Sequence, residues 1–164
     1  DVRVPADHLL GQEGKGFPLA MKTLDLARPM VAAMAVGICQ RAVDESVAYA
    51  KQRVTFGKPI VKHQAIQFKL ADMEMRTEAG RATIINALNA YYAGLPFGKE
   101  AAIAKCFCGD SAVQNALDAI QILGGYGYSR EYPVEKLLRD AKIMQIYEGT
   151  NEIQRVVIGG YVTA

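Results

Sequence analysis

Apolar side chains recur every three or four residues along most of the chain, which is the spacing of one face of an α-helix. This periodicity predicts three long helices, over residues 17–52, 62–93 and 98–123. The predicted apolar stripe of the third helix consists of Ile103, Cys106, Val113, Leu117 and Ile120. Gly57 and Pro59 interrupt the pattern after the first helix, and Gly94 and Pro96 end the second. Pro29, inside the first pattern, predicts either a kink or a later helix start.

Two shorter helices are predicted after the third, over residues 133–139 and 150–158. Thr150 is the expected N-cap of the last one. No stretch has the alternation of a hairpin or of a βαβ unit, and there is no internal repeat. The pattern therefore predicts an all-α fold, an up-and-down four-helix bundle with short additional helices, over residues 15–164. Residues 1–14 are expected to be a polar arm or the end of a strand.

Composition agrees with one compact domain. The chain has 164 residues, of which 51% are hydrophobic and 22% charged, so it is too apolar for disorder and can build a core without disulfides. A net charge of +2 is too weak to indicate nucleic-acid binding, and the longest apolar run, 30–39, is about half of a membrane span. Asp1 looks like a cut end, without a starting Met or a signal-peptide pattern.

Three classes of site are disfavoured by spacing. Only His8 and His63 are present, and neither follows a Glu by three residues, so no metal site is expected. The glycines of 124–127 fail the G-x-G-x-x-G test because position 130 is Arg, and they are typical of a helix C-cap. The three cysteines form no C-x-x-C motif and are expected to be reduced thiols of an intracellular protein.

Two positions carry candidate chemistry. Arg53 and Phe56 join a planar cation to an aromatic ring at a helix junction, which suits a phosphate-bearing ligand. Taken alone, these residues favour the simpler interpretation of a solvated loop in which Arg53 pairs with a local acid. Glu148 stands between Tyr147 and the flexible Gly149, just before a helix start. Burial there would favour its neutral acid and the helix N-terminus its carboxylate, so it is either a general base or a capping acid.

Several segments together resemble a known family. QILGGYG at 121–127, YPVE at 132–135, RDAK at 139–142 and YEGT at 147–150 resemble the C-terminal signature of the acyl-CoA dehydrogenases. Arg53-x-x-Phe56-Gly57 followed by His63-Gln64 does so too. The resemblance spans nearly the whole chain and is greatest to the straight-chain, medium-to-short-chain branch. It covers too many fixed spacings to be a chance match.

The resemblance implies an FAD-dependent enzyme that oxidises acyl-CoA to trans-2-enoyl-CoA. Glu148 would abstract the α proton while the β hydride goes to the flavin, and the Glu148 backbone N–H would help to stabilise the enolate oxygen. A branched-chain subgroup carries its base at the position of Ala27, which cannot act as one, so Glu148 is the expected base.

The same resemblance implies the binding residues. Arg53 and Phe56 would hold the FAD of a neighbouring subunit. The further expected FAD-binding residues are Gln64, Gln121, Gly125 and Thr150. The expected substrate-binding residues are Asp25, Arg28, Tyr147 and Gly149. The implied partners are the acyl-CoA substrate, an electron-transferring flavoprotein, and further copies of the chain in a homodimer or homotetramer.

Members of the family are about twice as long as this chain, with a helical domain and a β domain first. Residues 1–14 would then be the arm leading from that β domain. We expect the isolated 164 residues to be inactive and to bind FAD weakly. The implied process is fatty acid β-oxidation, in a bacterial cytoplasm or a mitochondrial matrix. Two alternatives stay open, an acyl-CoA oxidase-like or nitroalkane oxidase-like flavoenzyme, and a non-catalytic helical oligomerisation domain.

Overall fold

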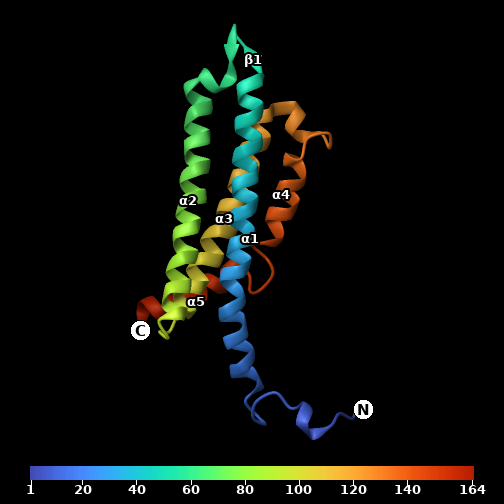
Figure 1. Cartoon of the computed structure of the whole chain (residues 1–164), viewed down its shortest axis with the longest axis vertical. Coiled ribbons are helices and arrows are strands. Elements are labelled where there is room, and N and C mark those ends of the chain that lie inside the picture. The colour runs from blue at the N-terminus through green and yellow to red at the C-terminus, as the bar shows by residue number, and fades with distance from the viewer.

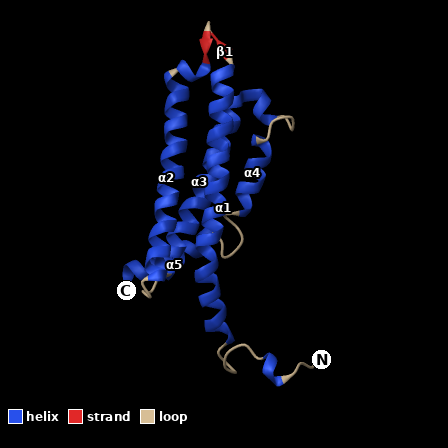
Figure 2. Cartoon of the chain, viewed as in Figure 1, coloured by secondary structure: helices blue, strands red, loops and turns tan.

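The computed structural model describes all 164 residues, and the predicted all-α fold is confirmed (Figures 1 and 2). The five α-helices are α1 Gly16–Gln52, α2 Gln64–Tyr92, α3 Gly98–Leu123, α4 Val134–Ile143 and α5 Asn151–Thr163. The first four form an up-and-down bundle in which α4 is the short member, and α5 crosses at the end where α2 turns into α3 (Figure 1). Short 3-10 helices span Ala6–His8, Ile60–Lys62 and Gly124–Tyr128.

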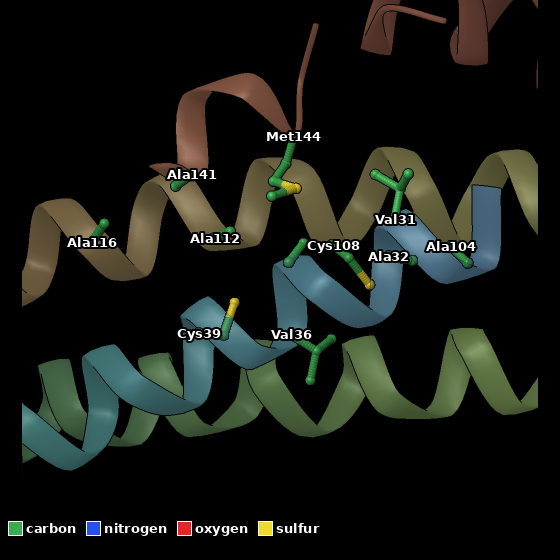
Figure 3. Close-up of a cluster of buried hydrophobic side chains, with 11 residues drawn as sticks. Val31, Ala32, Val36, Cys39, Ala104, Cys108, Ala112, Ala116, Ala141 and Met144 are labelled. Carbon is green, nitrogen blue, oxygen red and sulfur yellow. The ribbon is translucent and has the colours of Figure 1, made fainter. Parts of the chain in front are cut away.

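Helix α3 is the centre of the molecule, since it contacts each of the other four helices. Its buried face consists mainly of small residues, namely Ala101, Ala102, Ala104, Cys108, Gly109, Ala112, Ala116 and Ala119. Figure 3 shows several of them on the side of α3 that faces Val31 and Cys39 of α1 and Met144 beyond the end of α4. Small side chains allow the helices to approach closely. Larger ones would overpack the core, typically at a cost of about 1–3 kcal/mol.

Gly80 of α2 shows how close this approach is. A Cβ at that position would lie 3.0 Å from Val36 Cγ2 of α1 and 3.2 Å from Cys108 Sγ of α3. The periodicity placed Leu117 on the buried face of the third helix, and this was wrong, because Leu117 is 44% exposed. Alanine and cysteine carry the buried face instead. All three cysteines are buried and free.

Helix α1 runs without interruption through Pro29, which is buried inside it. The later helix start that Pro29 could have indicated is therefore wrong, since the helix begins at Gly16. By length and composition alone, α1 is also apolar enough to cross a membrane, with a mean hydropathy of 1.2 over its best 18 residues. Half of that window is buried inside the fold, as is usual for the core helix of a bundle.

A β-hairpin joins α1 to α2, although the sequence pattern gave no sign of one. Its strands β1 Val54–Thr55 and β2 Lys58–Pro59 pair antiparallel, and the turn residues Phe56 and Gly57 have φ of 50° and 75°. Positive φ at both central positions is the signature of the tight type I′ hairpin turn. Strands of two residues are too short to show an alternating pattern, which explains the wrong prediction.

The ends of the predicted short helices lie further along the chain than expected. Helix α4 continues to Ile143 and α5 to Thr163. The predicted N-cap of α5 is confirmed, because Thr150 Oγ1 accepts a hydrogen bond from the Ile153 backbone N–H at 3.3 Å. Gly124, with φ of 62°, ends α3. Residues 1–15 lie outside the bundle and are exposed (Figure 1).

Candidate active site

Glu148 lies in the loop between α4 and α5, and its backbone is in an unusual conformation. Its φ is 55° and that of Gly149 is 88°. A residue with a side chain rarely adopts the left-handed region, which costs about 1–3 kcal/mol and persists only where surrounding contacts impose it. Such positions are concentrated at functional sites, so the loop is a candidate functional site.

Side chains from two helices impose this conformation. Gln154 of α5 is buried, and its Nε2 donates to the carbonyl oxygens of Glu148 and Gly149 at 3.3 and 3.0 Å. Lys105 of α3 is also fully buried, and its Nζ donates to the Gly149 carbonyl oxygen at 2.7 Å. Both loop carbonyls are thus held from inside the fold. Neither Lys105 nor Gln154 was a candidate from the sequence.

Asn151 and Asp110 fix the end of the loop. Asn151 Oδ1 accepts from Lys105 Nζ at 2.9 Å, and its Nδ2 donates to Asp110 Oδ1 at 2.7 Å. Asp110 also accepts from Arg155 Nη2 at 2.6 Å and from Gln145 Nε2 at 2.7 Å. Burial alone would raise the pKa of Asp110, but these hydrogen bonds, led by that of Arg155, hold it below its usual value. For Lys105, burial lowers the pKa.

The Glu148 carboxylate is half-buried, and no group of this chain donates to it. Its backbone N–H also has no acceptor within the chain. The neighbouring Tyr147 is half-buried, and burial, followed by the charge of Glu148, raises the pKa of its phenol. A carboxylate and an N–H at one residue, both without a partner, can serve a bound ligand as proton acceptor and hydrogen-bond donor.

The expected substrate-binding residues on α1 form an ion pair in which Arg28 is buried and Asp25 is partly exposed. Arg28 Nη1 donates to Asp25 Oδ1 at 2.5 Å, and Arg28 is only 5% exposed. Its Nε is buried without a partner. A Cβ on Gly98 would lie 3.2 Å from Asp25 Oδ2 and 3.1 Å from the Tyr161 hydroxyl oxygen, so α1, α3 and α5 meet at this pair.

A second candidate site lies at the hairpin end of the bundle, in a cleft of about 670 Å³. The cleft is lined by Tyr49, Arg53, Thr55, Phe56, Ile60, His63, Ile66, Ile122, Leu123, Gly124, Gly125 and Tyr126. It brings together Arg53, Phe56 and Gly125, three of the residues expected to bind FAD. Gln64 and Gln121 are exposed, each directly beside a lining residue in the sequence but not lining the cleft themselves. Thr150 lies elsewhere, at the start of α5.

The side chains of this cleft suit a nucleotide with phosphates. Arg53 forms no ion pair, contrary to the interpretation that a local acid neutralises it, and its guanidinium carbon lies 5.9 Å from the centroid of the Tyr126 ring. Phe56 is 96% exposed, which leaves its ring free to stack on a base. A Cβ on Gly124 or Gly125 would meet nothing within 4 Å, so backbone is open to a ligand there. Guanidinium, aromatic face and bare backbone fit the diphosphate and adenine of FAD.

Comparison with known proteins gives the family. A family model described as "Acyl-CoA dehydrogenase, C-terminal domain" matches residues 14–162. This chain belongs to the acyl-CoA dehydrogenase family. Among curated relatives of the family, the acyl-CoA dehydrogenase of Bacillus subtilis (strain 168) is 55% identical over 162 residues, which are 99% of this chain and 43% of the relative. The short-chain-specific acyl-CoA dehydrogenase of Megasphaera elsdenii is 56% identical, over 98% of this chain and 42% of the relative.

Solved structures with the same fold include three that cover nearly the whole chain. Butyryl-CoA dehydrogenase from Megasphaera elsdenii matches all of this chain with a TM-score of 0.98 and 54% identity, over 43% of its own length. A chain in the structure described as the electron transferring flavoprotein of Acidaminococcus fermentans matches 97% with a TM-score of 0.95 and 48% identity, over 42% of its own length. PigA, described with FAD and proline, matches 99% with a TM-score of 0.95 and 29% identity, over 43% of its own length. The acyl-CoA dehydrogenase domain described here thus spans less than half of the relatives it matches.

Proposed function

We propose that this chain is the C-terminal helical domain of an FAD-dependent acyl-CoA dehydrogenase and that Glu148 is its catalytic base. The observation that carries the proposal is the backbone of Glu148, held in the left-handed region by buried donors from α3 and α5. Those contacts aim a carboxylate and an N–H that have no partner in the chain. A capping acid would need neither the strain nor the buried donors.

In the proposed reaction, the Glu148 carboxylate takes a proton from the α carbon of the acyl thioester. A double bond forms between the α and β carbons as one hydrogen leaves the β carbon as hydride, which gives the trans-2-enoyl thioester. FAD, when bound, supplies the acceptor for that hydride. The α proton is weakly acidic, so a positioned base contributes about 10²–10⁴-fold. The Glu148 N–H supports the same step by donating to the thioester oxygen, where negative charge develops.

The proposed FAD-binding residues lie in two places on one chain. Arg53, Phe56 and Gly125 line the cleft at the hairpin end, with Gln64 and Gln121 beside it, while Thr150 lies next to Glu148. Figure 1 shows the hairpin at one end of the bundle and the loop before α5 well away from it. We therefore propose that one copy supplies the hairpin residues and another supplies Thr150, in a homodimer or a homotetramer.

Asp25, Arg28, Tyr147 and Gly149 are the proposed substrate-binding residues. The short-chain-specific relative and the butyryl-CoA dehydrogenase structure support a short acyl chain as the substrate. The Acidaminococcus structure supports an electron-transferring flavoprotein as the physiological acceptor. Both fit a step in fatty acid β-oxidation, and the bacterial relatives support the cytoplasm of a bacterium as its compartment.

The test uses the complete enzyme that contains this chain, purified with FAD and mixed anaerobically with butyryl-CoA, octanoyl-CoA or palmitoyl-CoA. We expect butyryl-CoA to bleach the flavin absorbance fastest, and electron-transferring flavoprotein to restore it faster than oxygen. Fast turnover with oxygen would identify an oxidase-type member of the family instead. A protein that carries no flavin, or whose flavin no acyl-CoA reduces, would contradict the proposal and favour a non-catalytic helical domain.

A further inference from the structure

Lys105 stands out among the buried residues because it is a fully buried lysine without an ion pair to any carboxylate. It lies in the N-terminal third of α3, between the buried residues Ala104 and Cys106. Lysine is almost never fully buried unless it is paired, because removing an ammonium from water is costly. The two acceptors of its Nζ are neutral oxygens, those of the Gly149 carbonyl at 2.7 Å and the Asn151 amide at 2.9 Å.

The Gly149 carbonyl oxygen accepts hydrogen bonds from both α3 and α5. It accepts from Lys105 Nζ on one side and from Gln154 Nε2 at 3.0 Å on the other. Gln154 Nε2 also lies 3.3 Å from the Glu148 carbonyl oxygen. Any relaxation of the left-handed backbone at 148 and 149 would rotate these two carbonyls and break the hydrogen bonds. The ammonium therefore opposes the change that would redirect the Glu148 side chain.

The other acceptor of Lys105 is itself fixed. Asn151 Nδ2 donates to the Cys106 carbonyl oxygen at 3.1 Å and to Asp110, and its backbone N–H donates to the Gln145 carbonyl oxygen at 2.9 Å. The loop is thus closed on itself at 145 and 151 and anchored to α3 at both ends. Lys105 is the one donor that bonds both to Asn151 and to the Gly149 carbonyl oxygen.

We propose that Lys105 is a positioning residue for Glu148, an inference that rests on the proposed role of Glu148 as the base. Its ammonium holds the Gly149 carbonyl, and through it the direction of the Glu148 carboxylate and N–H. A lysine that only stabilises the fold would contribute to the free energy of unfolding and not to kcat. The two roles are separable because Gln154 still donates to the Gly149 carbonyl, and Asn151 still donates to Cys106 and Asp110, when Lys105 is replaced. The loop then stays attached to the fold but is held less firmly.

The experiment compares Lys105→Met, Lys105→Gln and the control Asn115→Ala in the complete FAD-loaded enzyme with butyryl-CoA. Met has a similar length and no donor, whereas Gln keeps an amide donor. Asn115 is equally buried on α3, but it binds Met73 and Thr77 of α2 and does not touch the loop.

We expect Lys105→Met to lower kcat at least about tenfold, with KM and FAD content little changed, because a misplacement of about 1 Å can lower the rate as much as 10²-fold. Lys105→Gln should recover part of that loss. Asn115→Ala should lower the melting temperature at least as much as Lys105→Met and leave kcat unchanged.

A double-mutant cycle with Glu148→Asp decides whether Lys105 acts through Glu148. The shorter side chain of the Glu148→Asp variant already displaces the base. Adding Lys105→Met to that variant should therefore lower kcat by a much smaller factor than it does in the wild type. Three results would overturn the proposal. They are fully additive effects of the two substitutions on the logarithm of kcat, an unchanged kcat in Lys105→Met, and a loss of kcat that follows the melting temperature across all variants. Should Lys105→Met fail to fold, Lys105→Gln carries the same comparison. Glu148→Gln is measured in parallel, and a normal rate there would refute the base itself, separately from Lys105.

Discussion

Two turns of this molecule share one backbone geometry and differ in everything around it. Phe56-Gly57 in the hairpin and Glu148-Gly149 before α5 each place a large residue and then a glycine at positive φ. The hairpin pair projects from the end of the bundle, with Phe56 96% exposed and only a two-residue ladder beside it. The Glu148 pair is gripped by buried donors from two helices.

The difference shows two ways of using a strained turn. A type I′ hairpin satisfies its own backbone, so it can present an aromatic ring outward at little cost to the core. The loop at Glu148 cannot satisfy itself, and the core supplies Lys105 and Gln154 for the purpose. The first arrangement suits contact with a ligand or a partner that lies outside the chain. The second suits a side chain whose direction must be fixed before the substrate arrives.

Alanine in place of the glycine of each turn tests whether the two turns differ as described, and Gly149→Ala has the larger expected effect. Its φ of 88° is strained for alanine, and the added Cβ would lie 2.7 Å from Gln154 Nε2. We expect the free energy of unfolding to fall by about 1–3 kcal/mol, and kcat by about tenfold or more as the carbonyl grip is displaced. Chemical denaturation and steady-state kinetics of the complete enzyme measure the two. A normal kcat would show that the hydrogen bonds to the Gly149 carbonyl do not set the position of Glu148.

Arg53→Gln tests the outward role of the hairpin. If Arg53 holds the FAD diphosphate, losing a charged hydrogen bond worth about 1.5–3 kcal/mol weakens FAD binding by about 10–100-fold. Titration of the deflavinated complete enzyme with FAD measures this. Lys58→Gln is the matched control, because it removes the same charge from the same hairpin at an exposed position outside the cleft. Equal weakening by both variants would point to a general effect of charge and not to a placed Arg53.

Gly57→Ala has the smallest expected effect of the three. Its φ is 75°, but an added Cβ meets nothing within 4 Å. Only the conformational cost of about 1 kcal/mol remains, and it falls on an exposed hairpin. We expect the melting temperature to change by a few degrees at most and kcat with saturating FAD not at all. A loss as large as that of Gly149→Ala would erase the distinction between the two turns.

Much of the helical frame could be predicted from the chain alone. The pattern placed the long helices at 17–52, 62–93 and 98–123, within two residues of α1, α2 and α3. It succeeded because each helix keeps its apolar spacing over seven or more turns. It was wrong about the buried face at Leu117, because the helices pack on alanine and cysteine there, and side-chain size, not hydrophobicity, decides which face can approach.

The candidate sites were predictable only as far as single residues carry a recognisable pattern. Glu148 and Arg53 could be singled out from their neighbours in the sequence. Lys105 could not, because it contacts the Gly149 carbonyl across 44 residues of sequence. Gln154 could not either, because its contact with Gly149 depends on the conformation of the loop before α5 and has no sequence pattern of its own. One signal was present for Lys105, a lone cation inside the apolar stretch 101–108. Such a residue either points outward or serves a buried acceptor, and only the fold distinguishes the two.

The role of Glu148 as the base is tested most sharply by the rate at which butyryl-CoA reduces the flavin in Glu148→Gln and Glu152→Gln forms of the complete enzyme. Each variant removes one carboxylate near the start of α5, but Glu152 is exposed on the first turn and is not aimed by buried donors. We predict that Glu148→Gln slows the reduction by about 10²–10⁴-fold with FAD still bound, while Glu152→Gln stays close to the wild type. Reduction at a normal rate in Glu148→Gln would show that Glu148 is not the base.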